Sequence, residues 1–302
     1  MIIDKVIDLD LTQKSGQTSQ PPWRENNGVF SEVVFVDNTP CIFSLENKGD
    51  GIEFNYKCEV SKNKALDRLN YIFDLDFDLD KFYKYLNNHD ELRDMSKFCH
   101  GLRLFKAKDP FECIISSICS ANNSIARWTK SISDMKDKWG VKIHDYPTFP
   151  EPGQIQEVFL DCENEINVCG TSCDNNLKAC GVGYRAPYIK KASSLLSAEI
   201  DLSDISQMNY DEAFETVLKL PGVGPKVADC ILLYGFDFKE AFPSDVWIKR
   251  IVSHLYFNDN DISVDKVRSF GMEEFGSYAG YVQLYMFHYA RKSGLMSKLK
   301  NL

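Results

Sequence analysis

Leu220-Pro-Gly-Val-Gly-Pro-Lys226-Val-Ala-Asp-Cys230 is the most informative stretch of this sequence. Gly222 and Gly224 can adopt backbone angles that other residues avoid. Pro225 suits the first position of a helix, because its missing N–H would have no partner there. The stretch therefore predicts a tight turn that opens a helix. Such a turn presents backbone N–H groups and the positive end of a helix dipole, which together bind an anion such as a phosphate.

Lys226 lies in the first turn of this predicted helix. The helix dipole disfavours a cation at that end, so we expect the pKa of the Lys226 ammonium to be lowered. A lysine that loses its proton readily can act as a nucleophile and form a Schiff base. Asp229 and Cys230 follow at i+3 and i+4, on the same helix face. Because a lone lysine in a turn is usually a solvated surface residue, the surrounding sequence has to decide between these interpretations.

A second motif follows in Phe242-Pro-Ser-Asp-Val-Trp-Ile-Lys-Arg250, where Asp245 comes 19 residues after Lys226. Hairpin, lysine and spaced aspartate together resemble the helix-hairpin-helix DNA glycosylase superfamily, and more narrowly the 8-oxoguanine DNA glycosylases. The resemblance covers most of the chain and is strongest over residues 101–291. It implies that the hairpin binds a DNA phosphate, that the aspartate is shared by all members, and that the lysine marks the members that also cut the strand.

Composition and charge set the limits for any function. The chain has 302 residues, 44% of them hydrophobic and 26% charged, as in an ordinary soluble protein of one large or two smaller domains. We expect no membrane segment and no signal peptide. The net charge of −9 opposes binding to nucleic acid. Cations near the two motifs nevertheless predict a local positive surface on an acidic body: Lys190, Lys191, Lys226, Lys249 and Arg250.

Ten cysteines without a secretion signal predict free thiols in a reducing compartment, so we expect a cytoplasmic or nuclear protein. Cys162, Cys169, Cys173 and Cys180 form a cluster that could bind a metal. In relatives such as endonuclease III, however, the iron–sulfur cysteines follow the catalytic aspartate, so we interpret these four as plain thiols. We expect no required cofactor. The resemblance implies at most a monovalent cation on the hairpin carbonyls near Leu218, Leu220 and Val223.

The residue pattern predicts an α+β protein with two domains. Residues 1–105 are predicted as an antiparallel β domain, with strands at 31–36, 40–45 and 51–56 separated by turn residues. Residues 106–302 are predicted as a larger helical domain that carries the hairpin at 219–226. Helix starts are predicted at Asp109, with Pro110 and Glu112 completing a capping box, and at Asn209 with Glu212. Trp128, Ile132, Met135 and Trp139 predict the buried face of a helix that stops at Gly140.

Four residues are predicted to hold a damaged base. Gly16, in Ser15-Gly-Gln-Thr18, resembles the family's glycine in the base pocket. The N7 of guanine accepts a hydrogen bond, but N7 of 8-oxoguanine carries a hydrogen, so a backbone carbonyl at Gly16 would distinguish them. On the last helix, Gln283 would hydrogen-bond the Watson–Crick edge and Phe287 would stack on the base. Cys230 would cover its other face. Without the resemblance, Ser-Gly-Gln is an ordinary turn and Phe287 a core residue.

A further set is predicted to contact the DNA itself. Asn122 resembles the residue that fills the gap left by a flipped base, a gap that costs a few kcal/mol of stacking. Arg127 and Arg185 would donate to the orphaned cytosine, and Tyr184 would wedge beside it. Without the resemblance, Asn122 would be interpreted as a helix C-cap and Arg127 as a solvated arginine. The predicted DNA-binding residues are Asn122, Arg127, Tyr184, Arg185, Gly222 and Gly224.

Asp245 has two compatible interpretations, as the N-cap of a helix from Val246 to Leu255 and as a carboxylate that stabilises positive charge on a sugar. Trp247 departs from the animal pattern, which has a phosphate-contacting histidine there, and Ser19-Gln-Pro-Pro22 departs from it as well.

We therefore predict a monomeric bifunctional glycosylase that removes 8-oxoguanine opposite cytosine from duplex DNA and cuts the strand through a Lys226 Schiff base and β-elimination, with Lys226 and Asp245 as its catalytic residues. The alternatives are a related glycosylase for another damaged base and a non-catalytic DNA-binding module. The related glycosylases for alkylated bases lack the lysine, and the binding module would have no use for it.

Overall fold

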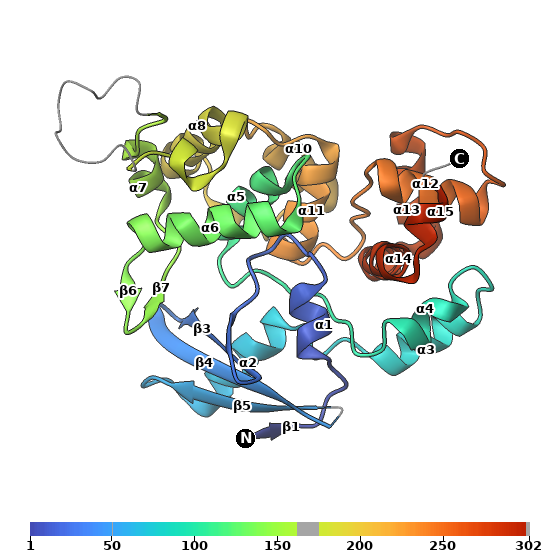
Figure 1. The fold of residues 1–302 in the computed structure, drawn as a ribbon, viewed down its shortest axis with the longest axis horizontal. Helices are drawn as coiled ribbons and strands as arrows, with labels where there is room; N and C mark the ends of the chain where they lie inside the picture. The colour runs from blue at the N-terminus through green and yellow to red at the C-terminus, as the bar shows by residue number, and fades with distance from the viewer. Residues whose placement is uncertain (50, 162–174, 300–302) are drawn as a thin grey trace.

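The computed structural model describes residues 1–49, 51–161 and 175–299. An antiparallel sheet near the N-terminus is followed by a larger helical body, which confirms the predicted α+β class (Figure 1). The sheet contains five strands in the order β1-β5-β4-β3-β2. Their bounds are β1 (Ile2–Ile3), β2 (Arg24–Asn26), β3 (Val29–Val36), β4 (Thr39–Lys48) and β5 (Gly51–Lys57). The three strands expected from the sequence are thus present, two of them a few residues longer.

One face of the sheet forms the first hydrophobic core. Cys41, Phe43 and Leu45 alternate along β4 with less buried neighbours, as expected for a strand with one covered face. They pack together with Ala65 and Leu69 of helix α2 (Lys62–Ile72). The sheet is therefore covered by a helix from its own domain.

The region predicted as an antiparallel β domain, residues 1–105, also contains four helices that were not expected from the sequence. These are α1 (Leu9–Lys14), α2, α3 (Leu79–Asn87) and α4 (Arg93–Phe98). Helix α3 begins where Asp78 accepts a hydrogen bond from Lys81 N, and it buries Leu79, Phe82 and Leu86 at helical spacing. These apolar residues join a core with helices from the far end of the chain, and Figure 1 shows α3 and α4 beside α14. Their acidic surroundings hid that periodicity in the sequence.

Short elements connect the remaining helices. The helices are α5 (Pro110–Ser120), α6 (Ile125–Trp139), α7 (Pro152–Glu157), α8 (Ala186–Ala198), α9 (Leu202–Ile205), α10 (Tyr210–Leu218), α11 (Pro225–Phe236), α12 (Val246–Tyr256), α13 (Val264–Phe275), α14 (Ala279–Ser293) and α15 (Leu295–Leu299). A two-stranded ribbon of β6 (Lys142–Ile143) and β7 (Tyr146–Pro147) follows α6. Single 3-10 turns, which lie at 178–180, 183–185 and 276–278, complete the connections.

Most predicted helix ends are confirmed. Asp109 caps α5 by accepting from the N–H groups of Phe111 and Glu112, and Asn209 and Glu212 form a capping box on α10. Helix α6 stops at Gly140. The predicted role of Glu112 in a capping box is wrong, because its fully buried carboxylate instead pairs with Lys108 Nζ at 2.5 Å.

On the buried face of α6, Trp128, Ile132 and Met135 lie in the core, as predicted. Trp139 is only half-buried, and its indole N–H donates to Asn175 Oδ1 at 2.7 Å.

The helices build two further cores that meet at α11. One contains Val227 and Ile231 together with residues of α5, α6, α8 and α10. The other contains Cys230, Leu233 and Tyr234 together with residues of α3, α4 and α12 to α15. Helix α11 therefore lies at the junction of the two helical bodies in Figure 1.

The expectation that all cysteines are free thiols is also wrong. Cys41 and Cys58 form a disulfide. The register of β4 and β5 pairs Ile42 with Lys57, so Cys41 and Cys58 come next to each other across the two strands. Within the described residues, the free cysteines are Cys99, Cys113, Cys119, Cys180 and Cys230. Cys162, Cys169 and Cys173 of the predicted cluster lie outside the described residues.

Candidate active site

One pocket contains all six residues predicted for catalysis and base binding. Four segments that are far apart in sequence line it: the loop after α1, the start of α11, the N-cap of α12 and the middle of α14. The six residues that converge there are Gly16, Lys226, Cys230, Asp245, Gln283 and Phe287. Thr18, Tyr234 and Pro243 also line the pocket and were not singled out from the sequence.

The predicted hairpin is formed by α10, a tight turn and α11. Gly222 in the turn has φ +85°, and a Cβ there would lie 3.0 Å from Tyr188 Cβ, so only glycine fits. Gly224 caps α11, and Pro225 takes its first position, as predicted. The N–H groups of the first turn of a helix have no acceptor within the helix. This end of α11 can therefore bind an anion.

The electrostatic environment of Lys226 differs from the prediction. Lys226 is half-buried in the first turn of α11. Burial lowers the pKa of its ammonium, whereas the Cys230 sulfur and the Asp245 carboxylate raise that pKa. The net shift is upward. The predicted lowering is wrong, because it considered only the helix dipole, which contributes about 0.3–1 kcal/mol, and left these two groups out. Burial raises the pKa of the Cys230 thiol and the neighbouring Lys226 ammonium lowers it, with a net upward shift.

Asp245 caps a helix, as predicted, and also lines the pocket. Its Oδ1 accepts hydrogen bonds from Trp247 N and Ile248 N, each at 2.9 Å, and so caps α12. The same side chain lines the pocket that contains Lys226. The cap fixes the carboxylate in place. The neighbouring Trp247 ring lies 5.1 Å from the Arg250 guanidinium, which brings a cation to this edge of the site.

Gln283 has a free acceptor in the pocket. Its Nε2 donates to Pro243 O at 3.0 Å, while its buried Oε1 has no partner. The side chain is therefore held by one end and can accept a hydrogen bond with the other. Phe287 lies one turn later on α14, half-buried, with the Arg291 guanidinium 5.4 Å from the centre of its ring.

Gly16 is required by its backbone and by its surroundings. Its φ is +95°, and a Cβ would lie 2.4 Å from Ile125 Cδ1 at the start of α6. The adjoining residues are held by polar contacts: Gln17 Nε2 donates to Arg103 O at 3.0 Å, and Thr18 Oγ1 lies 3.0 Å from Ser117 Oγ. The segment from the N-terminal domain is thus fixed against the helical body and forms one wall of the pocket.

The predicted DNA-contacting residues lie around two neighbouring loops. Asn122 is exposed, with φ +51°, between α5 and α6, and Arg127 is exposed in the first turn of α6. Tyr184 is 59% exposed just before α8. Arg185 is buried beneath it and donates to the carbonyls of Ala121 and Asn122. Its donors are therefore engaged by the loop that carries Asn122, a contact that sequence reasoning missed.

Two lysines of the predicted positive surface are engaged within the protein, and one of them is paired with a carboxylate. Lys190 Nζ donates to Val158 O at 2.8 Å, and Lys249 pairs with Asp261 at 2.5 Å. No group of three or more metal-binding side chains occurs in the described part of the chain. None of the helices there is long and apolar enough to cross a membrane.

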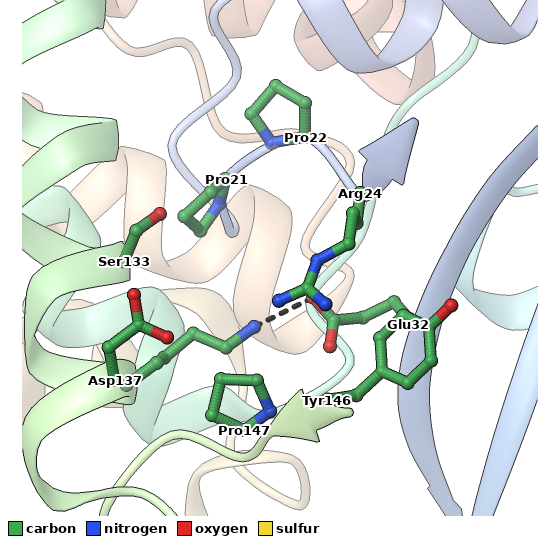
Figure 2. Close-up of a pocket in the computed structure, with 9 residues that line it drawn as sticks. Pro21, Pro22, Arg24, Glu32, Ser133, Asp137, Tyr146 and Pro147 are labelled. Atoms are coloured by element: carbon green, nitrogen blue, oxygen red, sulfur yellow. Dashed lines mark hydrogen bonds and ion pairs between the residues drawn. The ribbon is translucent and has the colours of Figure 1, made fainter. Parts of the chain in front are cut away.

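A separate cavity of about 240 Å³ lies between the sheet and α6 (Figure 2). Pro21 and Pro22, from the segment that departs from the animal pattern, form one side of it. Beneath it, Lys136 Nζ of α6 pairs with Glu32 Oε2 of β3 at 2.7 Å. This cavity is not connected with the residues of the lysine pocket, since the two share no lining residue.

A hairpin beside a pocket that combines a lysine with an N-capping aspartate defines a DNA glycosylase of the helix-hairpin-helix class. Residues 1–114 match the N-terminal domain of 8-oxoguanine DNA glycosylase, and residues 115–276 match the HhH-GPD superfamily of base excision DNA repair proteins. The chain belongs to that superfamily, in its 8-oxoguanine DNA glycosylase branch.

Relatives from three organisms illustrate the similarity. A probable N-glycosylase/DNA lyase of Methanothermobacter thermautotrophicus is 46% identical, over 97% of this chain and 96% of that protein. An 8-oxoguanine glycosylase/lyase of Clostridium acetobutylicum, solved with duplex DNA containing cytosine opposite 8-oxoguanine, has a TM-score of 0.80 at 29% identity and covers 96% and 93% of the two chains. A 3-methyladenine DNA glycosylase of Archaeoglobus fulgidus has a TM-score of 0.76 at 21% identity, covers 97% and 98%, and shares the fold alone.

Proposed function

We propose that this chain removes 8-oxoguanine opposite cytosine from duplex DNA and then cuts the strand, with Lys226 as the nucleophile. The observation that carries the proposal is the pocket itself. Lys226 and Asp245 share it with a fixed acceptor on Gln283, a stacking ring on Phe287 and the Gly16 segment. A module that only binds DNA would need none of this arrangement.

The chemistry follows from the groups in the pocket. After Lys226 has lost its ammonium proton, its amine attacks C1′ of the deoxyribose and the bond from C1′ to the base breaks; the base leaves with the electron pair on its nitrogen, which takes up a proton given up by the attacking amine. Positive charge that develops on the sugar is stabilised by the fixed Asp245 carboxylate. The sugar ring then opens to a Schiff base between Nζ and C1′. Loss of a proton from C2′ expels the 3′ phosphate and cuts the strand.

Recognition of the base would use complementary hydrogen bonds. Guanine and 8-oxoguanine present N–H donors at N1 and N2, which match the free Gln283 Oε1, whereas adenine presents an acceptor at N1. The Gly16 carbonyl would accept from the N7–H that only the oxidised base carries. Phe287 and Cys230 would cover the two faces of the base. Recognition of the lesion thus rests on two acceptors from different segments.

On the DNA side, we propose that Asn122 fills the gap and that Arg127 and Arg185 contact the unpaired cytosine. Arg185 would have to release the Asn122 carbonyl to do so. Tyr184 would act as the wedge, and the N–H groups around Gly222 and Gly224 would bind a phosphate. A second candidate, excision of an alkylated base, is favoured only by the shared fold of the 3-methyladenine enzyme.

Trapping with borohydride tests the proposal. The wild type and Lys226→Gln are incubated with duplexes that carry 8-oxoguanine opposite cytosine, 8-oxoguanine opposite adenine, or no lesion. We expect a covalent adduct only with the wild type, and most with cytosine opposite the lesion. Lys62→Gln, an exposed lysine at the start of α2, serves as the control and should trap normally. Tight DNA binding without an adduct or base release would refute the assignment and leave a binding module.

We also propose a monovalent cation at the hairpin, held by the carbonyls of Leu218, Leu220 and Val223. Backbone carbonyl oxygens are the ligands that hard cations prefer. Leu220 O accepts one hydrogen bond, from Val223 N at 3.1 Å, and keeps a second lone pair. Binding to duplex DNA in potassium chloride is compared with binding in tetramethylammonium chloride at equal concentration. Equal affinities would exclude the cation.

A further inference from the structure

A buried stretch of chain between α4 and α5, residues 102–107, contacts both walls of the base pocket; we call it the linking segment. It is neither helix nor strand, and all of its residues are buried. Buried backbone N–H and C=O groups outside helices and sheets need hydrogen-bond partners from elsewhere in the protein. The partners of the linking segment therefore show which parts of the molecule it holds together.

The first wall, residues 15–18, is attached to the linking segment by the side chain of Gln17. Gln17 Nε2 donates to Arg103 O at 3.0 Å, and its Oε1 accepts from Phe105 N at 2.8 Å. A residue on a neighbouring parallel strand would make the same pair of bonds with its backbone. The amide therefore fixes residue 17, which directly follows Gly16, at two points.

The second wall, on α14, is attached to the same segment by two buried tyrosines. Tyr285 Oη donates to Leu102 O at 2.8 Å, and Tyr281 Oη accepts from Leu104 N at 3.4 Å. These tyrosines lie two residues before and two residues after Gln283. Alternate residues of the linking segment thus bond to opposite walls, as extended backbone allows. The segment sets the spacing between the Gly16 loop and the Gln283 acceptor.

Gln17 also lines the pocket, but its amide is already engaged within the protein. Besides Arg103 O, its Nε2 lies 3.2 Å from Thr12 O and 3.0 Å from Ser15 Oγ. A side-chain amide has only two N–H donors, so none is left for a base. The side chain is 5% exposed. Gln17 therefore acts on a bound base through the backbone of Gly16 and not by direct contact.

We propose that Gln17 is the positioning residue for discrimination between 8-oxoguanine and guanine: its two bonds to the linking segment aim the Gly16 carbonyl at N7 of the base. A carbonyl so aimed accepts from the N7–H of the oxidised base and faces the lone pair on N7 of guanine. Hydrogen bonds weaken steeply as their angle departs from linear. Without the amide, the carbonyl loses its direction and the two bases are bound more equally. The inference rests on the proposed function, in which N7 of the base points toward Gly16.

The test is the ratio of the dissociation constants for two duplexes, with guanine or 8-oxoguanine opposite cytosine. Fluorescence anisotropy measures both in a Lys226→Gln background, which cannot cut the DNA. Gln17→Met keeps the length of the side chain but makes neither bond. We expect it to lower the preference for 8-oxoguanine by at least about fivefold, the factor that one neutral hydrogen bond contributes.

Gln20→Met is the matched control. Gln20 is a buried glutamine of the same loop, and it also donates to the linking segment, to Lys106 O at 2.8 Å. It does not line the pocket. Its substitution should therefore cost stability without changing the preference for 8-oxoguanine. The same fall in preference in both variants would overturn the inference.

A second measurement, with Lys226 intact, separates positioning of the carbonyl from general damage to the fold. A preformed abasic site presents no base to recognise, so Gln17→Met should lose far more in single-turnover release of 8-oxoguanine than in borohydride trapping on that site. Equal losses in the two assays, or an unchanged preference in binding, would contradict the proposal.

Circular dichroism at the assay temperature gives the folded fraction of each variant. Should Gln17→Met be unfolded, Gln17→Asn decides, because its amide is one methylene shorter and cannot reach both Arg103 O and Phe105 N. It should lower the preference in the same direction, and an unchanged preference would refute the role of Gln17. Failure of the wild type to release 8-oxoguanine would refute the proposed function instead.

Discussion

The Lys136→Met variant should unfold more easily than a variant with a comparable substitution on the exposed surface of the same helix. Lys136 Nζ of α6 lies 2.7 Å from Glu32 Oε2 of β3, and the two side chains are only 8% and 9% exposed. The variant keeps the bulk of the side chain but leaves the Glu32 carboxylate buried, with one hydrogen bond from Val33 N at 2.9 Å. The pair also connects the sheet with the helical body.

Removal of one partner from a buried ion pair costs about 3–5 kcal/mol, a large part of the roughly 5–15 kcal/mol that stabilises a folded protein. At about 2–4 °C for each kcal/mol, the melting temperature should fall by about 6–20 °C. The control is Lys130→Met on the same helix, where Lys130 is 75% exposed and pairs with Asp134 at 2.9 Å. That pair should contribute at most about 1 kcal/mol.

The loss of folding stability caused by Lys136→Met should also depend on pH. Burial raises the pKa of Glu32, but Lys108 and Lys136 lower it more, and the net shift is downward. A carboxyl with a lowered pKa contributes stability above its unfolded value and loses it as the pH falls. The difference between Lys136→Met and the wild type should therefore be full at pH 7 and shrink below about pH 4. Urea unfolding, followed by circular dichroism, measures this stability difference at pH 7 and at low pH. A loss at pH 7 no larger than that of Lys130→Met would refute the reasoning.

Three other outcomes are expected. Gly16→Ala places a Cβ 2.4 Å from Ile125 Cδ1 at a φ of +95°. Thermal melting should show a loss of stability of about 1–3 kcal/mol, and release of 8-oxoguanine should slow. Unchanged stability and rate would show that the loop adapts to the added methyl group. Gln283→Ala should slow release of the base by about tenfold or more, since it removes a buried acceptor, but leave trapping on an abasic site nearly unchanged; equal losses in both assays would contradict a role in base recognition. Reduction of the Cys41–Cys58 disulfide, which closes a separation of 17 residues, should lower stability by about 3 kcal/mol, and melting with and without dithiothreitol checks this against Cys41→Ser.

The sequence predicted best what depends on neighbouring residues. The hairpin around Gly222, the cap at Asp245 and the helix end at Gly140 are set by local backbone chemistry, and the structure contains all three. The convergence of Gly16 and Gln283 on one pocket was expected only from the resemblance, because no local pattern connects residues so far apart.

What the sequence did not predict depends on partners brought together by folding. Arg268 and Asp229 give no joint signal in the sequence, and their contact exists only once α13 packs on α11. The pKa of Lys226 was predicted from its helix position, but Cys230 and Asp245, which folding brings beside it in the pocket, raise that pKa. The disulfide could have been found from the register of β4 and β5, which the cysteine count alone does not give.

The pocket is built from both ends of the chain, with residues 15–18 on one side and Gln283 and Phe287 on the other. During synthesis, the first of these segments leaves the ribosome long before the last. Because α14 supplies the Gln283 and Phe287 side chains of the pocket, a nascent or truncated chain that ends before α14 has the hairpin and Lys226 but only part of the pocket lining. The complete pocket therefore forms only after α14 has been made and has packed against the helices that precede it.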